Sequence, residues 1–474
     1  MAKSKDKVMR VTFCGTNATE VTGSRTLLTV AESQYLFECG LHQSSKSIWE
    51  EYKINSAKFD FKAKDIDAVF VGHAHSDHVN LLPLLVKRGF TGNIYIPKDN
   101  FDLMRILMED CAHICDKDAE FLNRTGHSVE PLYTEEDVQA TLDRMVELPF
   151  GEKIVIDNHV TLRFTHSGHI TNSAHIELWA TNNNVMKKIY YTSDLGNTSV
   201  PCYYVHPIEP VSNADLVIAE ATYANPKRQI KPKDRQCDID KIKTVVEQTV
   251  EKGGKILFPV FANHRCQTIL TVLYEIYGND KNFNTQIYVD SPMAVKICKL
   301  MCHIVNEKQM HIWEKVMTWK NVHFISEYAD SKALQETSEP CIILASSGMM
   351  SAGRSVSWAQ KLLGSTKNHF VFCGYSAEGS LADKIRNSMQ KTITIDGKVV
   401  PNKAYVTTLN SFSSHIQHNQ MLEYYSDIDC NKIAIVHSNF NDKEKFCKEL
   451  QDEYSKKNKS TKVVCVNGGT AISL

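Results

Sequence analysis

The sequence predicts an α/β protein of two domains, one inserted into the other. Three observations predict this fold class. Short β-like runs fill the segment 8–38 and return within 154–192. From about residue 226, apolar runs alternate with helical spacing, which is typical of a parallel sheet with covering helices. Strand-like runs resume after residue 404 without a low-complexity linker, which is compatible with one domain inserted into another.

The individual elements are predicted from hydrophobic periodicity. Before residue 226, strands are expected at 8–13, 27–30, 35–38, 66–71, 154–156, 161–165 and 188–192, and helical sequence at 81–87 and 101–145. In the alternating part, strands are expected at 255–259, 286–290, 341–345 and 369–373, and helices at 239–252, 267–277, 293–304 and 381–389. The tail adds strands at 404–409, 432–436 and 462–466 and a helix at 443–454.

Composition limits the class of function. The chain has 474 residues, enough for two or three domains, and is 42% hydrophobic, so a sizeable core is expected. Its 54 Lys and Arg balance 55 Asp and Glu, which leaves a formal net charge of −1. That balance excludes a histone-like polyanion binder but leaves room for a local phosphate site.

Cysteine usage and hydropathy indicate the compartment. The 14 Cys are scattered and form no C-x-x-C pair, and the apolar stretch near the start is too short for a signal peptide. No run of eighteen apolar residues is present. We therefore expect a cytoplasmic protein with free, mostly buried thiols, including the pairs Cys111/Cys115 and Cys298/Cys302.

The strongest chemical signal is a loop that follows the apolar strand 66–71. Three imidazoles and a carboxylate occur within six positions there, at His73, His75, Asp77 and His78. Nitrogen and hard oxygen ligands suit Zn²⁺, and this number of ligands suits two ions. Such ions, roughly 3.5–4 Å apart, could hold a bridging hydroxide and clamp the attacking and leaving oxygens of a reaction.

This H-x-H-x-D-H pattern resembles the metallo-β-lactamase superfamily, and further motifs extend the resemblance over nearly the whole chain to the β-CASP nucleases. These motifs lie at 13–15, 20–24, 37–41, 167–174, 193–196, 219–223, 258–267, 290–294, 346–354, 374–381, 411–415 and 433–437. The resemblance implies an αββα metallo-β-lactamase sandwich with an inserted α/β β-CASP domain. The sandwich would comprise residues 1–209 and 406–474, and the inserted domain residues 210–405.

The resemblance also implies the roles of individual residues. One zinc would be held by His73, His75 and His169, and the other by Asp77, His78 and His437, with Asp194 bridging the two ions. Asp77 would also orient the attacking hydroxide. His415, oriented by Glu220, would be the general acid that protonates the leaving 3′-oxygen, a task suited to a histidine beside a carboxylate.

Loops of the inserted domain are expected to bind substrate, because each follows an apolar strand and opens a helix. The candidate residues are Arg265, Ser347, Gly348, Arg354, Tyr375 and Ser380. For both arginines an ordinary salt bridge remains an open alternative. A basic run within 226–235 could line an entry path for substrate, but a solvated loop is the commoner meaning of such a run.

Four positions depart from the family pattern. Glu38 stands where Asp is usual, His264 and Ala352 each replace a Gly, and Asn439 replaces an acid often found after the last motif. None of them removes a metal ligand or the general acid, so activity is still expected. The longer Glu38 side chain puts the orientation of a neighbouring zinc ligand in question.

The sequence therefore predicts a hydrolase: a zinc-dependent ribonuclease that cleaves single-stranded RNA by two-metal hydroxide attack. It would be an endonuclease that could also act as a 5′-exonuclease. The alternatives are a DNA-directed β-CASP nuclease, a catalytically quiet RNA-binding subunit of a processing complex and, least favoured, a small-molecule hydrolase. No membrane partner is expected, and a homodimer is left open.

Overall fold

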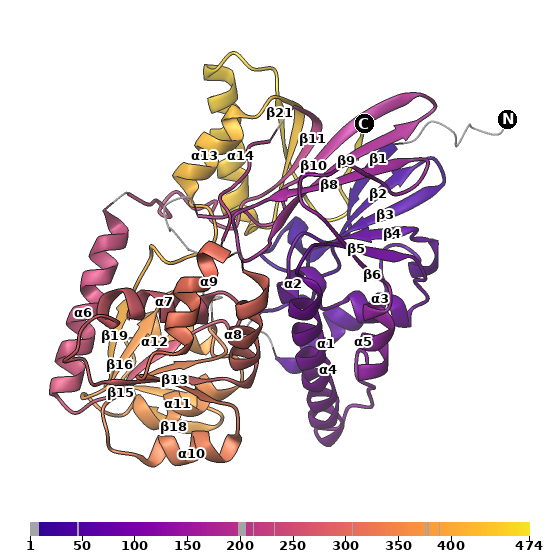
Figure 1. Cartoon of the computed structure of the whole chain (residues 1–474). Helices are drawn as coiled ribbons and strands as arrows, with labels where there is room; N and C mark the ends of the chain where they lie inside the picture. Colours follow the sequence, from indigo (N-terminus) through magenta and orange to yellow (C-terminus); the bar gives the residue numbers. More distant parts are fainter. Residues whose placement is uncertain are drawn as a thin grey trace. The chain divides into compact units, whose positions relative to one another are not determined.

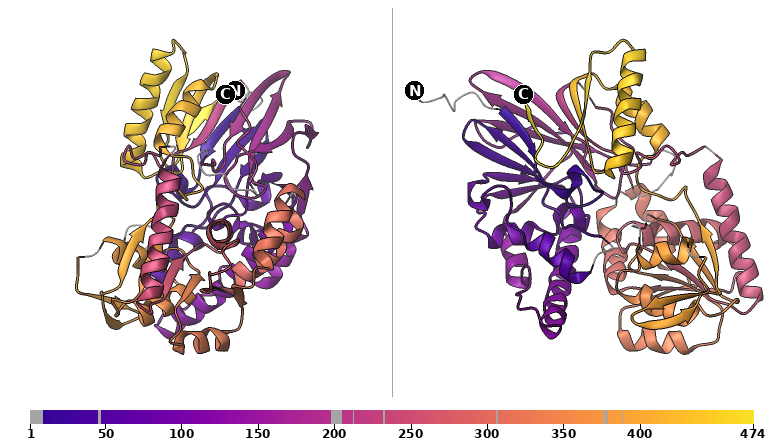
Figure 2. Two further views of the ribbon diagram at one scale, coloured as in Figure 1. Left: turned by 60° about the vertical axis from the view of Figure 1, so that its left-hand side comes forward. Right: turned by 180° about the vertical axis from the view of Figure 1, so that it is seen from behind.

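The computed structural model describes residues 9–44, 47–197, 205–211, 213–231, 233–305, 307–374, 376, 379–387 and 389–474. They form two compact units (Figure 2). The first unit takes the chain up to Thr198, then Val205–Gln229 and His415–Leu474, and the second takes Ile230–Ser414. The units change at 229–230 and 414–415, somewhat after the expected 209–210 and 405–406. The reason is strand pairing, because the strand at Ala214–Glu220 belongs to a sheet of the first unit and Tyr405–Thr408 to the sheet of the second.

The first unit contains two seven-stranded sheets (Figure 1). One has the order β22-β1-β2-β3-β4-β5-β6, the other β21-β20-β11-β10-β9-β8-β7. The first sheet comprises β1 (Met9–Phe13), β2 (Thr26–Val30), β3 (Ser33–Phe37), β4 (Ala68–Phe70), β5 (Asn93–Pro97), β6 (Met145–Leu148) and β22 (Ala471–Ser473). The second comprises β7 (Ile154–Val155), β8 (Val160–His166), β9 (Ala174–Asn182), β10 (Val185–Tyr191), β11 (Ala214–Glu220), β20 (Cys430–Val436) and β21 (Lys462–Cys465).

The two sheets pack face to face over one apolar core. Alternate residues of β8, such as Leu162 and Phe164, point inward and meet Phe37 and Phe70 of the other sheet. Helices lie outside the sheets: α1 (Ile48–Ser56), α2 (Ser76–Val79), α3 (Leu82–Lys87), α4 (Phe101–Arg124), α5 (Glu135–Leu142), α13 (His418–Asp427) and α14 (Phe440–Lys456). The predicted αββα sandwich is confirmed, and strands from both ends of the chain complete it.

The second unit holds a parallel six-stranded sheet of order β14-β13-β15-β12-β16-β19. Its strands are β12 (Ile256–Pro259), β13 (Gln286–Asp290), β14 (Val322–Ile325), β15 (Cys341–Ala345), β16 (His369–Phe372) and β19 (Tyr405–Thr408), with a separate hairpin of β17 (Thr392–Ile395) and β18 (Lys398–Pro401). Its helices are α6 (Asp234–Glu251), α7 (Arg265–Tyr277), α8 (Pro292–Ile304), α9 (Glu307–Met317), α10 (Tyr328–Glu336), α11 (Arg354–Leu362) and α12 (Leu381–Asn387).

Helices cover both faces of this sheet, which explains why its strands read as continuous apolar runs. Leu334, Trp358 and Ile385, from α10, α11 and α12, pack on the face that carries Ile343 and Phe370. Figure 1 shows α7, α8 and α9 on the opposite face. The predicted strand–helix alternation is therefore confirmed.

One sequence expectation is wrong. The helix-like stretch 101–145 is not one helix, because α4 ends at Arg124, α5 covers only Glu135–Leu142, and Met145 already begins β6. The break follows from local chemistry: Gly126 adopts a positive φ of 98° and Pro131 precedes α5.

The described residues also bear on the thiols and on membrane insertion. Their cysteines are free, and Cys111, Cys115 and Cys298 are buried as expected, whereas Cys302 is half-buried. Among these residues, every helix is too short or too polar to span a bilayer.

Asp290, at the end of β13, organises one end of the second unit. Its fully buried carboxylate accepts hydrogen bonds from Arg354 Nη1 at 2.6 Å, Trp358 Nε1 at 2.7 Å and Ser331 Oγ at 2.5 Å. One carboxylate thus fixes β13, α10 and α11 to each other.

We predict that Asp290→Ala lowers the free energy of unfolding by about 3–5 kcal/mol, because it leaves the Arg354 charge and the Trp358 N–H without their acceptor. Urea denaturation followed by tryptophan fluorescence measures this. The exposed Asp330→Ala, on α10, is the control and should cost about 0.5 kcal/mol or less. Equal losses in the two variants would contradict the prediction.

Candidate metal centre

The histidine loop is held by close backbone packing at the end of β4. Gly40 passes so near Asp77 that a Cβ on it would overlap the Asp77 carbonyl. Cys39 N–H donates to His78 O at 2.9 Å and Ser24 N–H to Asp77 O at 2.8 Å. The segment 38–41 therefore fixes the backbone that carries Asp77 and His78.

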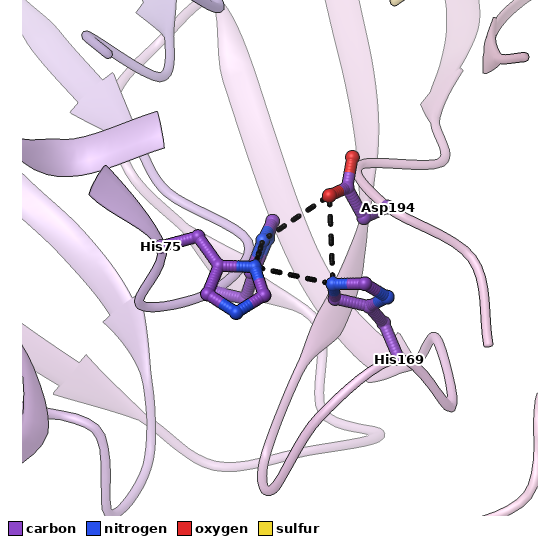
Figure 3. A group of neighbouring side chains, drawn as sticks. His75, His169 and Asp194 are labelled. Atoms are coloured by element: carbon purple, nitrogen blue, oxygen red, sulfur yellow. Dashed lines mark hydrogen bonds and ion pairs between the residues drawn. The ribbon is translucent and has the colours of Figure 1, made fainter. Parts of the chain in front are cut away.

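A first group of ligand atoms gathers around Asp194 Oδ2 (Figure 3). Figure 3 shows His75, His169 and Asp194 pointing toward one another. His75 Nδ1 lies 3.1 Å from His73 Nε2 and 3.2 Å from His169 Nε2. Both Nε2 atoms lie 3.5 Å from Asp194 Oδ2. Four ligand atoms thus face a common centre.

A second group faces the other oxygen of the same carboxylate. His78 Nε2 lies 3.4 Å from Asp194 Oδ1 and 3.6 Å from Asp77 Oδ2. His437 Nε2 lies 3.1 Å from Asp77 Oδ2, and His437 Nδ1 lies 3.6 Å from Asp194 Oδ1. Asp194 therefore presents one oxygen to each group.

The spacing of these atoms fits zinc. Four ligands in a tetrahedron about 2.0–2.1 Å from Zn²⁺ lie about 3.3–3.4 Å apart. The distances within the two groups run from 3.1 to 3.6 Å. His78 Nε2 and Asp194 Oδ1 are buried and have no hydrogen-bond partner among the described residues, which is expected of atoms that serve as metal ligands.

The protonation states of the first group also suit metal binding. Burial lowers the pKa of His75 to about 4 and lowers the pKa values of His73 and His169 well below the usual value, so these imidazoles are neutral near pH 7. Burial opposes the charged form of Asp194 as well, yet the nearby His78 and His437 hold its pKa well below the usual value. Neutral imidazole and ionised carboxylate are the forms that bind metal.

Glu38 supports the second group from behind. Its carboxylate is fully buried and accepts from His78 Nδ1 at 2.5 Å, Tyr191 OH at 2.8 Å and Ser193 Oγ at 2.6 Å. Ser193 Oγ also lies 2.9 Å from His73 Nδ1. The extra methylene of Glu38 is thus accommodated, at a backbone φ of 59°, and one carboxylate orients a histidine of each group.

The candidate general acid lies beside the first group. His415 Nδ1 is 3.2 Å from Glu220 Oε1, which also accepts from Leu195 N–H at 3.0 Å. Glu220 Oε2 accepts from Thr222 N–H at 2.7 Å. The His415 side chain is 15% exposed, whereas His73 and His169 are fully buried, so His415 can reach a substrate.

The expected substrate-binding residues lie in the second unit in varied surroundings. Arg265, at the first turn of α7, is buried, and its Nε and Nη1 atoms have no hydrogen-bond partner among the described residues. Arg354 is engaged with Asp290 and the carbonyls of Ser326 and Glu327.

Of the other four candidates, three lie among the described residues. Ser347 Oγ donates to Ala352 O at 3.2 Å, Gly348 is buried against Phe261, and Ser380 Oγ accepts from Asp383 N–H at 3.2 Å. Tyr375 lies outside the described residues.

The remaining departures from the family pattern have local explanations. His264 has a positive φ of 69° at the residue before α7, a conformation that glycine adopts without strain. Asn439 caps α14, with its side chain accepting from Asn441 N–H at 3.2 Å. Nothing in the structure distinguishes Ala352 from the usual Gly.

Sequence reasoning missed three supporting residues. Tyr191 and Ser193 hold Glu38, and Thr222 Oγ1 lies 3.0 Å from His437 Nδ1. Ser193 lies in the motif 193–196 beside Asp194, and Thr222 lies in the motif 219–223 near Glu220. Their positions in these motifs were the signal that could have identified them. Tyr191 carried none, because a tyrosine at the end of a strand is ordinary core sequence.

Comparison with known families agrees with this geometry. Residues 18–113 match the model of the metallo-beta-lactamase superfamily, residues 266–385 that of the Beta-Casp domain, and residues 399–462 that of the Zn-dependent metallo-hydrolase RNA specificity domain. The first match lies in the first unit and the second in the second unit. The third begins in the second unit and continues into the C-terminal part of the first.

Curated relatives span most of the chain. Ribonuclease TTHA0252 of Thermus thermophilus is 32% identical over 427 residues, 89% of this chain and 91% of that protein. Transcription termination factor FttA of Methanocaldococcus jannaschii is 27% identical over 91% of this chain and 67% of its own length. An RNase J-like protein of the same organism is 29% identical over 85% of this chain and 86% of its own length.

A solved structure supports the fold alone. The crystal structure of a protein of unknown function from Enterococcus faecalis V583 covers 99% of this chain and is itself covered completely, with a TM-score of 0.53 and 11% identity.

We predict that Glu38→Gln weakens zinc binding by about 10–100-fold, because an amide NH₂ would face donors that now share a carboxylate. Competition with a chromogenic chelator measures the affinity. Glu32→Gln, in the exposed turn between β2 and β3, is the matched control and should bind zinc as the unmodified chain does. An unchanged affinity in Glu38→Gln would show that this contact does not support the ligands.

Proposed function

The chain belongs to the β-CASP family of the metallo-β-lactamase superfamily, and from this we propose that it is a zinc-dependent ribonuclease. The observation that carries the proposal is the placement of Asp194, whose two oxygens face two separate groups of histidine and carboxylate ligands. Two groups joined by one carboxylate are the arrangement that a two-metal phosphodiesterase requires.

We assign one Zn²⁺ to His73, His75 and His169 and a second to Asp77, His78 and His437, with Asp194 shared by both. The 3.1–3.6 Å spacing and the buried atoms without hydrogen-bond partners support this assignment. When bound, two such ions supply positive charge for the phosphate and a nucleophile at neutral pH.

The chain's own residues would then carry the proton steps. Asp77 is 20% exposed and is the ligand carboxylate that reaches solvent, so it can accept a hydrogen bond from the attacking water. The nucleophile would be hydroxide, formed when a water releases a proton to solvent. As the hydroxide oxygen bonds to phosphorus, the bond from phosphorus to the 3′-oxygen would break, and His415 Nε2 would donate a proton to that oxygen. Glu220 holds His415 Nδ1 and so fixes which nitrogen faces the substrate.

We propose single-stranded RNA as the substrate, because residues 399–462 match an RNA specificity domain and relatives of similar length carry the name ribonuclease. In the second unit, Arg265 has two buried N–H donors with no hydrogen-bond partner in the described part of the chain, and it is the strongest candidate to bind a backbone phosphate there. Arg354 is less suited, because its guanidinium already forms an ion pair with Asp290. Ser347, Gly348, Tyr375 and Ser380 complete the proposed substrate contacts.

We propose endonucleolytic cleavage, with 5′-exonuclease activity as a second mode. Incubation with RNA whose 5′ end is blocked or free separates these modes, since an exonuclease needs the free end. A DNA strand of the same sequence tests the nuclease alternative, and cleavage of DNA at the same rate would contradict the proposed RNA preference.

His415→Ala should lower kcat for RNA by about 10²–10⁴-fold while zinc content stays unchanged, because it removes a proton donor and no proposed metal ligand. Steady-state kinetics with a fluorescent RNA, alongside elemental analysis, checks both quantities. His113→Ala, on α4, is a control that removes a histidine outside the site. Full activity of His415→Ala would remove His415 from the mechanism.

His78→Ala should lose zinc from the second group and, with it, the nuclease activity. The expected zinc content is about one ion per chain, because the ligands of the first group remain. Retained nuclease activity with unchanged zinc content would overturn the two-metal assignment. Chelation of the unmodified chain should abolish cleavage, and added Zn²⁺ should restore it.

A further inference from the structure

A short loop after β11 is fastened to the chain segment that follows His415. His418 N–H donates to Arg228 O at 2.8 Å, and His418 Nδ1 donates to Ala224 O at 2.8 Å. His418 Nε2 in turn contacts Glu449 Oε2 at 2.8 Å. The loop 223–228 is therefore held in a fixed position relative to the proposed general acid, within the first unit.

The Tyr223 side chain connects this loop to His415. Its buried ring meets the His415 ring edge to face, with centroids 5.7 Å apart and an interplanar angle of 77°. The guanidinium carbon of Arg228 lies over the same ring, 4.6 Å from its centroid. A cation held over an aromatic face is attracted to it, so the ring directs Arg228 to the neighbourhood of His415.

The charge of Arg228 is not neutralised within the described part of the chain. Its guanidinium makes no hydrogen bond or ion pair there, and the side chain is partly exposed. The adjacent carboxylates are committed elsewhere: Glu220 to Leu195, Thr222 and His415, and Glu449 to His418. By contrast, Arg163 is paired with Glu177 and Arg235 with Glu275. Arg228 thus offers donors that have no partner among the described residues and are held over the same Tyr223 ring that His415 contacts.

We propose that Arg228 binds the RNA backbone phosphate next to the scissile bond on the leaving-group side. The side follows from the shared Tyr223 ring, because His415 would protonate the leaving oxygen and Arg228 contacts the same ring. A guanidinium matches a phosphate through two parallel N–H···O bonds, which a lysine cannot reproduce. This inference rests on the proposed ribonuclease function and adds a specific contact to the leaving strand.

The test compares Arg228→Ala and Arg228→Lys with the control Arg10→Ala. Arg10 is an exposed arginine of β1 in the same unit, so its removal changes the net charge equally. The RNA is single-stranded and carries phosphorothioate linkages, which slow hydrolysis. Its affinity is measured by fluorescence anisotropy at salt concentrations from about 50 to about 200 mM, a range in which phosphate contacts make affinity depend on salt.

Arg228→Ala should weaken RNA binding about tenfold and reduce the slope of log affinity against log salt by about 0.7, the value for one phosphate contact on a single strand. Arg228→Lys should keep the slope and recover only part of the affinity. The loss of kcat/KM in Arg228→Ala should be about tenfold greater for RNA than for bis(p-nitrophenyl) phosphate, which offers a single phosphate.

Two results would overturn the inference: affinity and salt slope of Arg228→Ala equal to those of Arg10→Ala, or no RNA binding by the unmodified chain. Failure of the proposed function is distinct, because it appears as an unmodified chain with bound zinc that cleaves neither RNA nor the diester. The binding comparison still decides the role of Arg228 in that case. Thermal melting monitored by circular dichroism identifies a variant that fails to fold, and Arg228→Lys then carries the test.

Discussion

The site depends on one carboxylate, Asp194, serving two groups of ligands at once. Its oxygens face His73 and His169 on one side and His78 and His437 on the other, within 3.4–3.6 Å. These residues come from loops that follow β4, β8, β10 and β20, so both sheets and both ends of the chain must be in register before the groups form. β20 pairs in parallel with β11, and β11 with β10, so His437 and Asp194 follow strands that end at the same edge of the sheet.

Meeting this requirement costs backbone strain. Glu38, Ser193 and His437 all adopt positive φ, at 59°, 49° and 54°, and such residues cost on the order of 1–3 kcal/mol each. The strain is offset by a closed set of hydrogen bonds, in which Glu38 accepts three donors and His437 N–H donates to Asn17 O at 2.6 Å. The strained residues therefore lie where the surrounding contacts are densest, and a polar network that supports the metal ligands also stabilises the fold.

Residue pattern alone predicted the parallel sheet of the second unit and the histidine loop, because both depend on local periodicity and close spacing. The ligand set and its division between two ions came from the family resemblance, and the structure brings the same residues together. What the sequence could not supply is contact between distant segments. Tyr191 bonding Glu38, or Arg228 over Tyr223 beside His415, depends on tertiary register. The helix-like sequence predicted over 101–145 forms two helices with a break between them, because turn chemistry at Gly126 interrupts the amphipathic pattern.

Net charge first argued against a polyanionic partner, and the site shows why that total is a poor guide. Glu38, Asp77, Asp194 and Glu220 gather around the ligand groups, a local concentration of carboxylates that the total charge of the chain does not reveal. Two Zn²⁺ ions would bring four positive charges, enough to balance these four carboxylates. Arg228, which has no ion pair among the described residues, adds a cation over the Tyr223 ring that His415 also contacts. Under the proposed two-zinc assignment, metal binding and the binding of a phosphate substrate would therefore be coupled by electrostatics.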